Sequence, residues 1–221
     1  MKTVTGNIVR KCYSRLGKAV TSYAEAIAAV GFSIIPTAIP HPYKTGETIP
    51  NETGLFRSDT KDCLGIHSNR FAVLQPAESL RALERARELV NGKWSTVQVN
   101  KGGRMIAGFV DLDTEIKAPK RGDTIALSLA YFDHFDGGGK ARFSLSGCNL
   151  TCDNGMTSLK SIISFNEKHI GDIAGRLSVV EAKMQFELAM AVETMREQVT
   201  KLDATPMSSD EVTGFARALF P

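Results

Sequence analysis

The sequence predicts an α+β fold, in which an antiparallel β-meander of about four strands packs on an amphipathic helix and a long C-terminal helix. Three observations support this prediction. Apolar and polar residues alternate along 124–131 and 140–146, as they do in half-buried strands. The predicted strands follow one another through connections too short to contain a crossover helix. From residue 158 onward the apolar period becomes 3.6, which is typical of a helix.

The length allows about one or two domains, and with 43% hydrophobic residues the chain can bury a core; we expect a single α+β domain covering residues 1–221. The sequence has no apolar run of about 18 residues and no apolar N-terminal stretch like that of a signal peptide, so no membrane partner is expected. The four cysteines form no CxxC pair, and neither zinc nor another cofactor is expected.

Charge is unevenly distributed although the net charge is only +3. Residues 1–24 carry five basic and no acidic side chains, whereas the stretch from Glu181 to the end is net acidic. This asymmetry indicates either a charged surface that binds a partner or head-to-tail association between subunits. The alternative, that both ends are simply solvated surfaces, stays open.

The N-terminal quarter contains one clear helix. Residues 1–20 show no clean period and form either a basic arm or a folded element. The alanine-rich stretch that follows is predicted to be a short helix, capped by Thr21 or Ser22 and ended by Gly31. A short strand is expected at 32–35. Prolines then predict a long loop or extended connection, and they are Pro36, Pro40, Pro42 and Pro50.

The middle of the chain reads as strands around one helix. Residues 55–74 contain short apolar runs separated by the turn-rich DTKD and SNR, which predicts a small hairpin and a return strand. Pro76 begins an amphipathic helix. Strands are predicted at 96–99 and 104–112, and an exposed basic loop at 117–123.

The hairpin at 124–150 is the centre of this arrangement. Its two strands are joined by a glycine-rich turn, and a β-bulge is expected where the alternation fails at Gly147. One face of the hairpin is apolar. The other face is small, polar and cationic, and it carries Lys140 and Arg142.

Behind the hairpin, the apolar period predicts one very long helix from Ser158, or two helices broken near Gly171 and Gly175. Pro206 ends the helical pattern. Residues 204–221 then contain a short capped helix with an apolar face, which is expected to dock on this subunit or on a neighbour.

Six short motifs follow one another along the chain in this order: EAIAAVGF, FRSDTKDCLGIHSNRFAVLQ, KGGRMIAGFVDL, HFDGGGKARF, CDNGM and KHIGDIAGRL. Together they resemble the phage and plasmid proteins grouped as domain of unknown function family 932. Family members are similar in having an asparagine two residues after a cysteine, matched by Cys152 and Asn154, and a His-x-Gly, matched by His169 and Gly171. The chain departs from the family in its three turn glycines, where serines are common, and in the Gly-Met pair of CDNGM.

The order of helix, meander and long helix is similar to the core of single-strand annealing recombinases of the Rad, Erf and Redβ type. This resemblance implies ATP-independent binding and annealing of single-stranded DNA by a ring or helical oligomer of the chain. It also implies recombination in a phage or plasmid, in the cytoplasm of a bacterial host cell. The analogy is one of fold, and fold alone does not determine function.

Basic side chains are the candidates for binding DNA phosphates, because such binding is independent of sequence and sensitive to salt. We expect them along one edge of the meander and on the start of the long helix, and they are Lys101, Arg104, Lys117, Lys120, Arg121, Lys140, Arg142, Lys160, Lys168 and Arg176. Phe132 and Phe135 would stack on bases. Tyr131 falls on the apolar face of the strand by its alternation, so it is expected to be buried in the core. For each cation taken singly, a solvated side chain is the simpler interpretation.

The turn residues Asp133, His134 and Asp136 are close enough in sequence to form a metal or acid–base site. Aspartate and glycine also serve backbone turn geometry, and this structural interpretation is favoured for Asp133, His134 and Asp136, as well as for Gly137. The same structural role is expected for Cys152, Asn154, His169 and Gly171. The sequence contains no GxxxxGK[ST], HExxH or GxSxG motif, so we expect no covalent chemistry.

Two hypotheses therefore remain, and a third is weaker. The first is a single-stranded DNA annealing protein. The second is a non-enzymatic, oligomeric interaction protein of a mobile element that acts on a host protein. The weaker third is a metal-dependent nuclease that uses Asp133 and Asp136.

Overall fold

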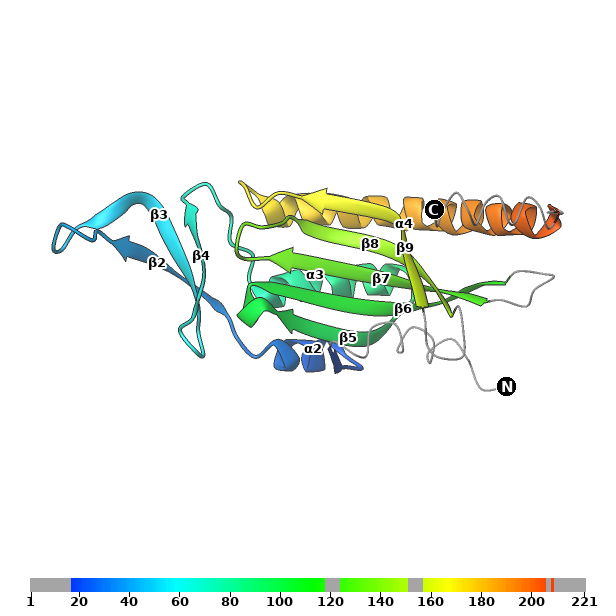
Figure 1. The fold of residues 1–221 in the computed structure, drawn as a ribbon, viewed down its shortest axis with the longest axis horizontal. Coiled ribbons are helices and arrows are strands. Elements are labelled where there is room, and N and C mark those ends of the chain that lie inside the picture. The colour runs from blue at the N-terminus through cyan, green and yellow to red at the C-terminus, as the bar shows by residue number, and fades with distance from the viewer. Residues whose placement is uncertain (1–16, 118–123, 151–156, 206–207, 209–221) are drawn as a thin grey trace.

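The chain forms two antiparallel sheets and a set of helices, which is the predicted α+β class (Figure 1). The computed structural model describes residues 17–117, 124–150, 157–205 and 208. The larger sheet has six strands in the order β1-β5-β6-β7-β8-β9, and the smaller has three in the order β2-β3-β4. Their bounds are β1 Lys18–Ala19, β2 Ile34–Pro40, β3 Thr48–Arg57, β4 Cys63–Ser68, β5 Lys93–Asn100, β6 Met105–Lys117, β7 Thr124–His134, β8 Ala141–Leu150 and β9 Thr157–Glu167.

Local signals in the sequence explain where the helices begin and end. Helix α2, Tyr23–Val30, begins where the Ser22 hydroxyl accepts a hydrogen bond from a backbone N–H, and ends at Gly31, which has a φ of 73°. At the start of helix α3, Pro76–Leu89, the Glu78 carboxylate accepts a hydrogen bond from the backbone N–H of Gln75, as in a capping box. Helix α4 spans Ile173–Ala204, and a single 3₁₀ turn, η1, covers Lys101–Gly103.

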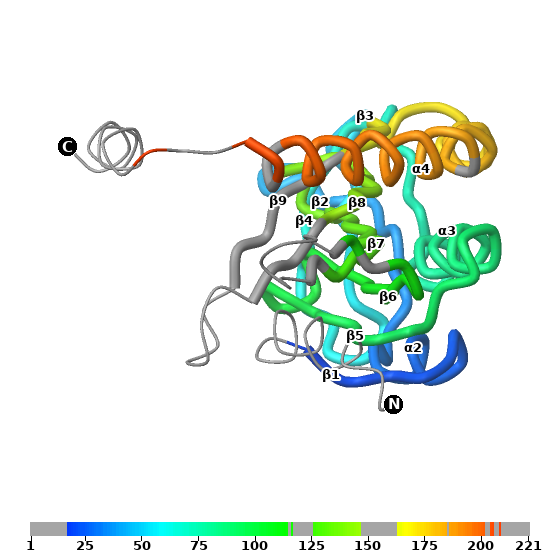
Figure 2. Tube along the Cα trace, turned by 90° about the vertical axis from the view of Figure 1, so that its right-hand side faces the viewer, coloured from blue at the N-terminus to red at the C-terminus, as the bar shows by residue number. Residues whose placement is uncertain are grey.

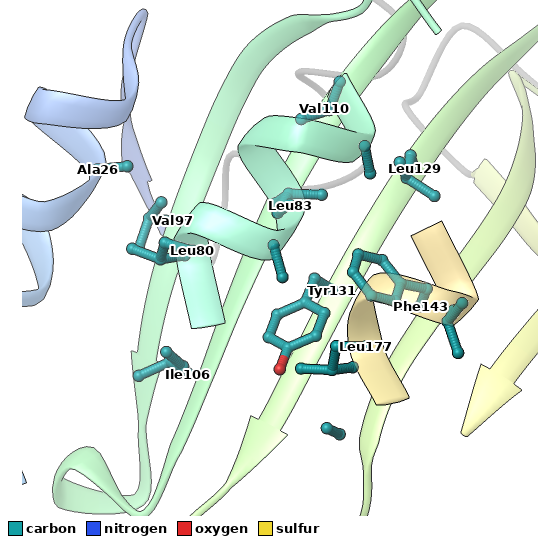
Figure 3. Packing of buried hydrophobic residues seen from close by; sticks show 14 of the residues in the cluster. Ala26, Leu80, Leu83, Val97, Ile106, Val110, Leu129, Tyr131, Phe143 and Leu177 are labelled. Atoms are coloured by element: carbon teal, nitrogen blue, oxygen red, sulfur yellow. The ribbon is translucent and has the colours of Figure 1, made fainter. Parts of the chain in front are cut away.

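The helices cover one face of the six-stranded sheet. Figure 2 shows α2 and α3 on the same side of the strands, with α4 beside α3 and along the β9 edge. Leu83 of α3 and Leu177 of α4 lie on the same side of the strands as Tyr131 (Figure 3), and all three are buried. Helix α3 approaches the sheet closely, since a Cβ at Gly108 would lie 2.6 Å from Leu83 Cδ2. A bidentate pair between Arg85 and Glu181 joins α3 to α4.

The opposite face of the large sheet departs from the prediction. The small and polar side chains in its middle are buried, and they include Ala126, Ser128, Ala130, Ser144 and Ser146. Phe109, on the same face, is only 2% exposed and meets Phe132 edge to face. The alternation of the hairpin is therefore as predicted, but the polar face is not an open surface along its length. Among the residues of β7, β8 and β9 whose burial the structure describes, the accessible part of this face is at its turn end.

The proline-rich stretch, predicted to be a long loop or an extended connection, is part of a hairpin. Strand β2 pairs with β3 from Ile34↔Arg57 to Pro40↔Thr48, so that Pro36 and Pro40 both lie within a strand. Because β2 is at the edge of its sheet, a proline that lacks an N–H on the outer side of this strand removes no hydrogen bond between strands. In the described stretch between β4 and α3 the predicted return strand is absent, and an isolated bridge joins Phe71 to Ile170.

The stretch after the hairpin is a strand and not the start of the long helix. Strand β9 pairs with β8 from Ala141↔Glu167 to Leu150↔Thr157, which extends the predicted four-strand meander to five consecutive strands. The register shifts between Leu145 and Ser146, next to the bulge predicted at Gly147. Beyond β9 the helical prediction is correct, and α4 begins at Ile173, just before Gly175.

The small sheet is attached to the turn end of the large sheet. Arg57 donates to the carbonyl of Gly102 in η1 at 3.1 Å. His67 Nε2 donates to the carbonyl of Phe135 at 2.8 Å, in the turn between β7 and β8. The predicted basic arm lies outside the described residues up to residue 16, as does nearly all of the predicted C-terminal helix. Among the helices described, none has the length and apolar character needed to cross a membrane.

Candidate nucleic-acid interface

Three connections meet at one end of the six-stranded sheet, which we call the turn end. They are η1 between β5 and β6, residues 135–140 between β7 and β8, and residues 168–172 between β9 and α4. Antiparallel pairing brings them together because each strand reverses direction at its neighbour. Exposed basic side chains stand on or next to these connections, and they are Lys101, Arg104, Lys140, Arg142 and Lys168. We call this set the turn-end cations.

The turn-end cations have no ion-pair partner among the described residues. Lys101 and Arg142 both lie near His134. Burial lowers the pKa of His134 below its ordinary value, and the positive charges of Lys101 and Arg142 act in the same direction. The negative charges of Asp136 and Asp133 act on His134 more strongly and in the opposite direction, so charges of both signs meet at this end of the sheet.

A row of side chains crosses the sheet at the accessible part of its polar face. Phe132, Arg142 and Asn166 are direct cross-strand neighbours on β7, β8 and β9. The guanidinium carbon of Arg142 lies 4.6 Å from the centre of the Phe132 ring, as in a cation–π contact. Asn166 and its neighbour Ser164 are exposed beside them.

This row can do two things for a nucleic acid. The Phe132 ring holds the guanidinium plane of Arg142, and guanidinium planes and aromatic rings are surfaces on which unpaired bases stack. The five N–H groups of an arginine also match phosphate oxygens. Asn166 adds an amide that can donate and accept hydrogen bonds.

The structure divides the ten predicted cations into separate groups. Arg176 is occupied, because its Nε donates to Glu167 at 2.9 Å and its other nitrogen to the carbonyl of Lys168 at 2.6 Å. Lys117 and Lys160 belong to the far half of the strands, where Lys117 pairs with Thr124. Lys120 and Arg121 lie outside the described residues. Five of the ten residues therefore lie at the turn end, and Lys117 and Lys160 do not share that edge as predicted.

Asp133 is not a turn residue, because β7 continues through it and buries its carboxylate completely. One carboxylate oxygen accepts hydrogen bonds from the hydroxyls of Ser79 and, at 3.2 Å, Tyr131. The other accepts from the backbone N–H of His134 at 2.8 Å and lies 2.7 Å from Nε2 of His169. We call Ser79, Tyr131, Asp133 and His169 the buried network.

His169 is the cationic member of the buried network. Its Nδ1 donates to the carbonyl of Ala72 at 3.1 Å, while Nε2 faces the carboxylate of Asp133 in a close ion pair with poor hydrogen-bond geometry. Since both neighbours are acceptors, the ring fits its doubly protonated form. Burial opposes that charge, but the contact with Asp133 and its negative charge raise the pKa of His169 above its ordinary value.

Aromatic stacking continues from the buried network into the small sheet. The ring of Phe71 lies between His169, at 4.8 Å, and His67, at 4.0 Å. The network therefore joins α3, β7 and the β9–α4 connection, and the stack adds β4. It acts as a fixed support behind the turn-end cations and has no exposed member that a substrate would reach.

The remaining motif residues have backbone roles where they are described. The Asp136 carboxylate accepts from the N–H of Gly138 at 2.8 Å, and Gly137 and Gly171 have positive φ values of 73° and 55°. Cys152 and Asn154 lie outside the described residues. Within the part of the chain that is described, no group of three His, Cys, Asp or Glu side chains is placed to hold a metal ion.

The sequence prediction missed three residues of this region. Asn166 and Ser164 were assigned to a helix, although the alternation of SIISFNE would have placed them on one face of a strand. Ser79 comes from a helix 54 residues before Asp133, and no sequence signal links the two.

A family model described as Domain of unknown function (DUF932) matches residues 63–221. No curated protein and no solved structure matches the chain. The matched region begins at β4 and includes all of the turn-end cations and the whole buried network, but not β2 or β3.

Proposed function

Since this chain belongs to the family described as Domain of unknown function (DUF932), whose description states no activity, we propose from its own surface that it binds and anneals single-stranded DNA. We further propose that it does so as an oligomer, without ATP, in recombination of a phage or plasmid inside a bacterial cell. The proposal rests on the turn-end cations and on the resemblance to annealing recombinases.

The observation that carries the proposal is the arrangement of Arg142 over Phe132 among exposed cations that form no ion pair within the described part of the chain. Lysine and arginine at this density neutralise phosphates and release counterions whatever the base sequence. An aromatic ring that holds a guanidinium plane gives one base a place to stack. Duplex DNA has no unstacked base to offer, so this combination favours a single strand.

The mechanism needs binding and no bond-making step. Two complementary strands repel one another through their phosphates, and protein cations reduce that repulsion. A strand held by its backbone keeps its other bases free to pair. The buried network contributes by fixing β7 and the β9–α4 connection, which set the spacing of the cations.

The test is the affinity for a single-stranded oligonucleotide, measured by fluorescence anisotropy over a range of salt concentrations. The variant Lys140→Glu with Arg142→Glu should lower the affinity by at least about tenfold. The plot of the logarithm of the binding constant against the logarithm of the salt concentration should also become less steep. Its slope should fall in magnitude by about 1.4, because each phosphate that the protein no longer neutralises accounts for about 0.7. The matched control is Lys44→Glu with Lys201→Glu, which changes the net charge equally at exposed sites on the β2–β3 connection and the end of α4. The control should bind as the unaltered chain does.

Absence of binding at low ionic strength would remove the proposal. Equally weakened binding in the two double variants would show that only the net charge matters. Annealing is measured separately, by the rate at which two complementary labelled oligonucleotides pair, and should fall in the Lys140/Arg142 variant together with binding. Particle images with and without oligonucleotide test whether a ring or filament forms.

A specific observation also favours the second hypothesis, an interaction protein that acts on a host protein. Val179, Phe186 and Met190 expose between 56% and 77% of their surfaces on α4. A host protein captured equally by the unaltered chain and by the Lys140/Arg142 variant, without DNA binding, would support this alternative. We do not retain the metal nuclease, because the Asp133 carboxylate is fully buried and already has four neighbours.

A further inference from the structure

Arg142 presents a free guanidinium on the accessible part of the polar face. It is exposed on β8, and within the described ranges of the chain its guanidinium has no hydrogen-bond or ion-pair partner. Its cross-strand neighbours, Phe132 and Asn166, carry no charge. A carboxylate at either position would take two N–H groups of the arginine at once. The fork formed by these N–H groups is thus left for a ligand.

Packing that begins in the buried part of the sheet orients this guanidinium. Phe109 is 2% exposed, and its ring meets that of Phe132 edge to face with 5.7 Å between the ring centres. The Phe132 ring in turn has the guanidinium carbon of Arg142 4.6 Å from its centre. An arginine that already lies on a fixed ring loses less freedom when it binds a ligand than one that extends into solvent.

Two groups of a DNA strand match an arginine fork, and only one of them carries sequence information. A phosphate accepts from the fork whatever the base, but the neighbouring Lys101, Lys140 and Lys168 serve phosphates equally well as point charges. Guanine offers its O6 and N7 as two adjacent acceptors, and arginine binds this edge more often than any other base edge. Adenine has an amine donor in place of O6, and neither pyrimidine offers two adjacent acceptors there.

Recognition of this edge of guanine is compatible with annealing. O6 and N7 face the major groove once guanine has paired with cytosine, so a contact with them leaves the pairing edge of the base accessible. A contact with the pairing edge itself would have to be broken before the complementary strand could bind.

We propose that the Arg142 fork recognises guanine in a single strand through O6 and N7, so that the strand has a preferred register on each subunit. This inference rests on the function proposed above and adds to it a modest base preference. The turn-end lysines hold the backbone whatever the sequence, and Arg142 selects which nucleotide lies over Phe132.

The experiment compares four oligonucleotides that differ at one central base in a run of thymines. The base is thymine, guanine, hypoxanthine or 7-deazaguanine, and the dissociation constant is measured by fluorescence anisotropy. Guanine should lower this constant about fivefold relative to thymine, near the lower end expected for a bidentate contact because the site is exposed. Hypoxanthine keeps O6 and N7 and should equal guanine. In 7-deazaguanine a carbon replaces N7, so most of the gain should be lost.

The variant Arg142→Lys keeps the charge and removes the fork. It should bind the all-thymine strand within about twofold of the unaltered chain, and it should bind the guanine strand no better. The matched control is Arg104→Lys, the same change at another exposed arginine of the turn end, which should keep the preference for guanine. Circular dichroism of both variants checks that the fold is kept.

The outcomes separate this inference from the proposed function. Salt-sensitive binding with equal affinity for the thymine and guanine strands would overturn the inference and leave the function intact. A preference for guanine that persists with 7-deazaguanine or in Arg142→Lys would also overturn it, because the preference would then come from stacking or from another residue. Absence of any binding at low ionic strength would remove both.

Discussion

The buried network makes a quantitative prediction for Asp133→Ala. The substitution leaves the charge of His169 unpaired and removes the acceptor of the Ser79 and Tyr131 hydroxyls, all in the protein interior. Breaking a buried ion pair by removing one partner costs about 3–5 kcal/mol, and each buried hydroxyl left without a partner adds to this in a non-additive way. We therefore expect the free energy of unfolding to fall by about 3–5 kcal/mol, out of the roughly 5–15 kcal/mol of a typical domain.

The chain carries its own probe for this measurement. Its single tryptophan, Trp94, is 6% exposed, so its fluorescence changes when the domain unfolds. In urea titrations the midpoint should fall by roughly 2 M, for a slope of about 2 kcal/mol per molar. The control is Asp113→Ala, which breaks the pair with Lys93 where both side chains are more than half exposed. It should cost less than about 1 kcal/mol.

The same network predicts how stability depends on pH. Because the pKa of His169 is raised on folding, its contribution is fully present below the ordinary histidine pKa of 6.5 and is lost as the pH rises through the raised value. His134 has a lowered pKa and acts in the opposite direction, so the variant His169→Gln is needed to separate them. The stability difference between the unaltered chain and His169→Gln should shrink with rising pH. Equal costs for Asp133→Ala and Asp113→Ala, or a pH-independent difference, would refute this account of the network.

Three further predictions concern packing outside the network. Glu181→Ala removes the buried end of the pair that joins α4 to α3 and should cost about 1–3 kcal/mol in urea titrations, since the remaining arginine is half exposed and can be solvated. Gly31→Ala forces a side chain into a φ of 73° and should lower the melting temperature by about 2–4 °C, for a cost of about 1 kcal/mol. The pKa of Glu84 is lowered, first by the hydrogen bonds that its carboxylate accepts from Arg87 and also by the one that it accepts from Trp94. The cost of Glu84→Gln should therefore be largest above pH 4.5 and fall as the pH drops through the lowered value, measured by Trp94 emission.

The elements that the sequence predicts well are those whose signals are local. Helix α3 has its proline, its capping glutamate and its apolar stripe within one stretch, and the β7–β8 hairpin has its alternation and its turn. Strand β9 was missed because Ile162, Ile163 and Ile170 were assigned to the apolar helical period that continues through α4. Pairing with β8 overrides that local pattern.

The candidate site was predictable only in part, for a physical reason. The alternation of the hairpin places Lys140 and Arg142 on its polar face, and this requires only the period of a strand. Burial of Ser144 and Ser146 on the same face depends on what the rest of the chain covers, which no local period contains. The contact of His169 with Asp133 joins residues brought together by the β9–α4 connection, so it needs the tertiary fold.

The two prolines of β2 have a consequence for how the small sheet meets other molecules. An exposed edge strand normally offers a row of free N–H groups onto which a foreign strand can add, and this is a common route to aggregation. Pro36 and Pro40 remove donors from a strand of seven residues, so a backbone-paired extension of this sheet past β2 would be interrupted at two places. A molecule that binds this side of the hairpin then depends more on side-chain contacts than it would at an ordinary edge strand.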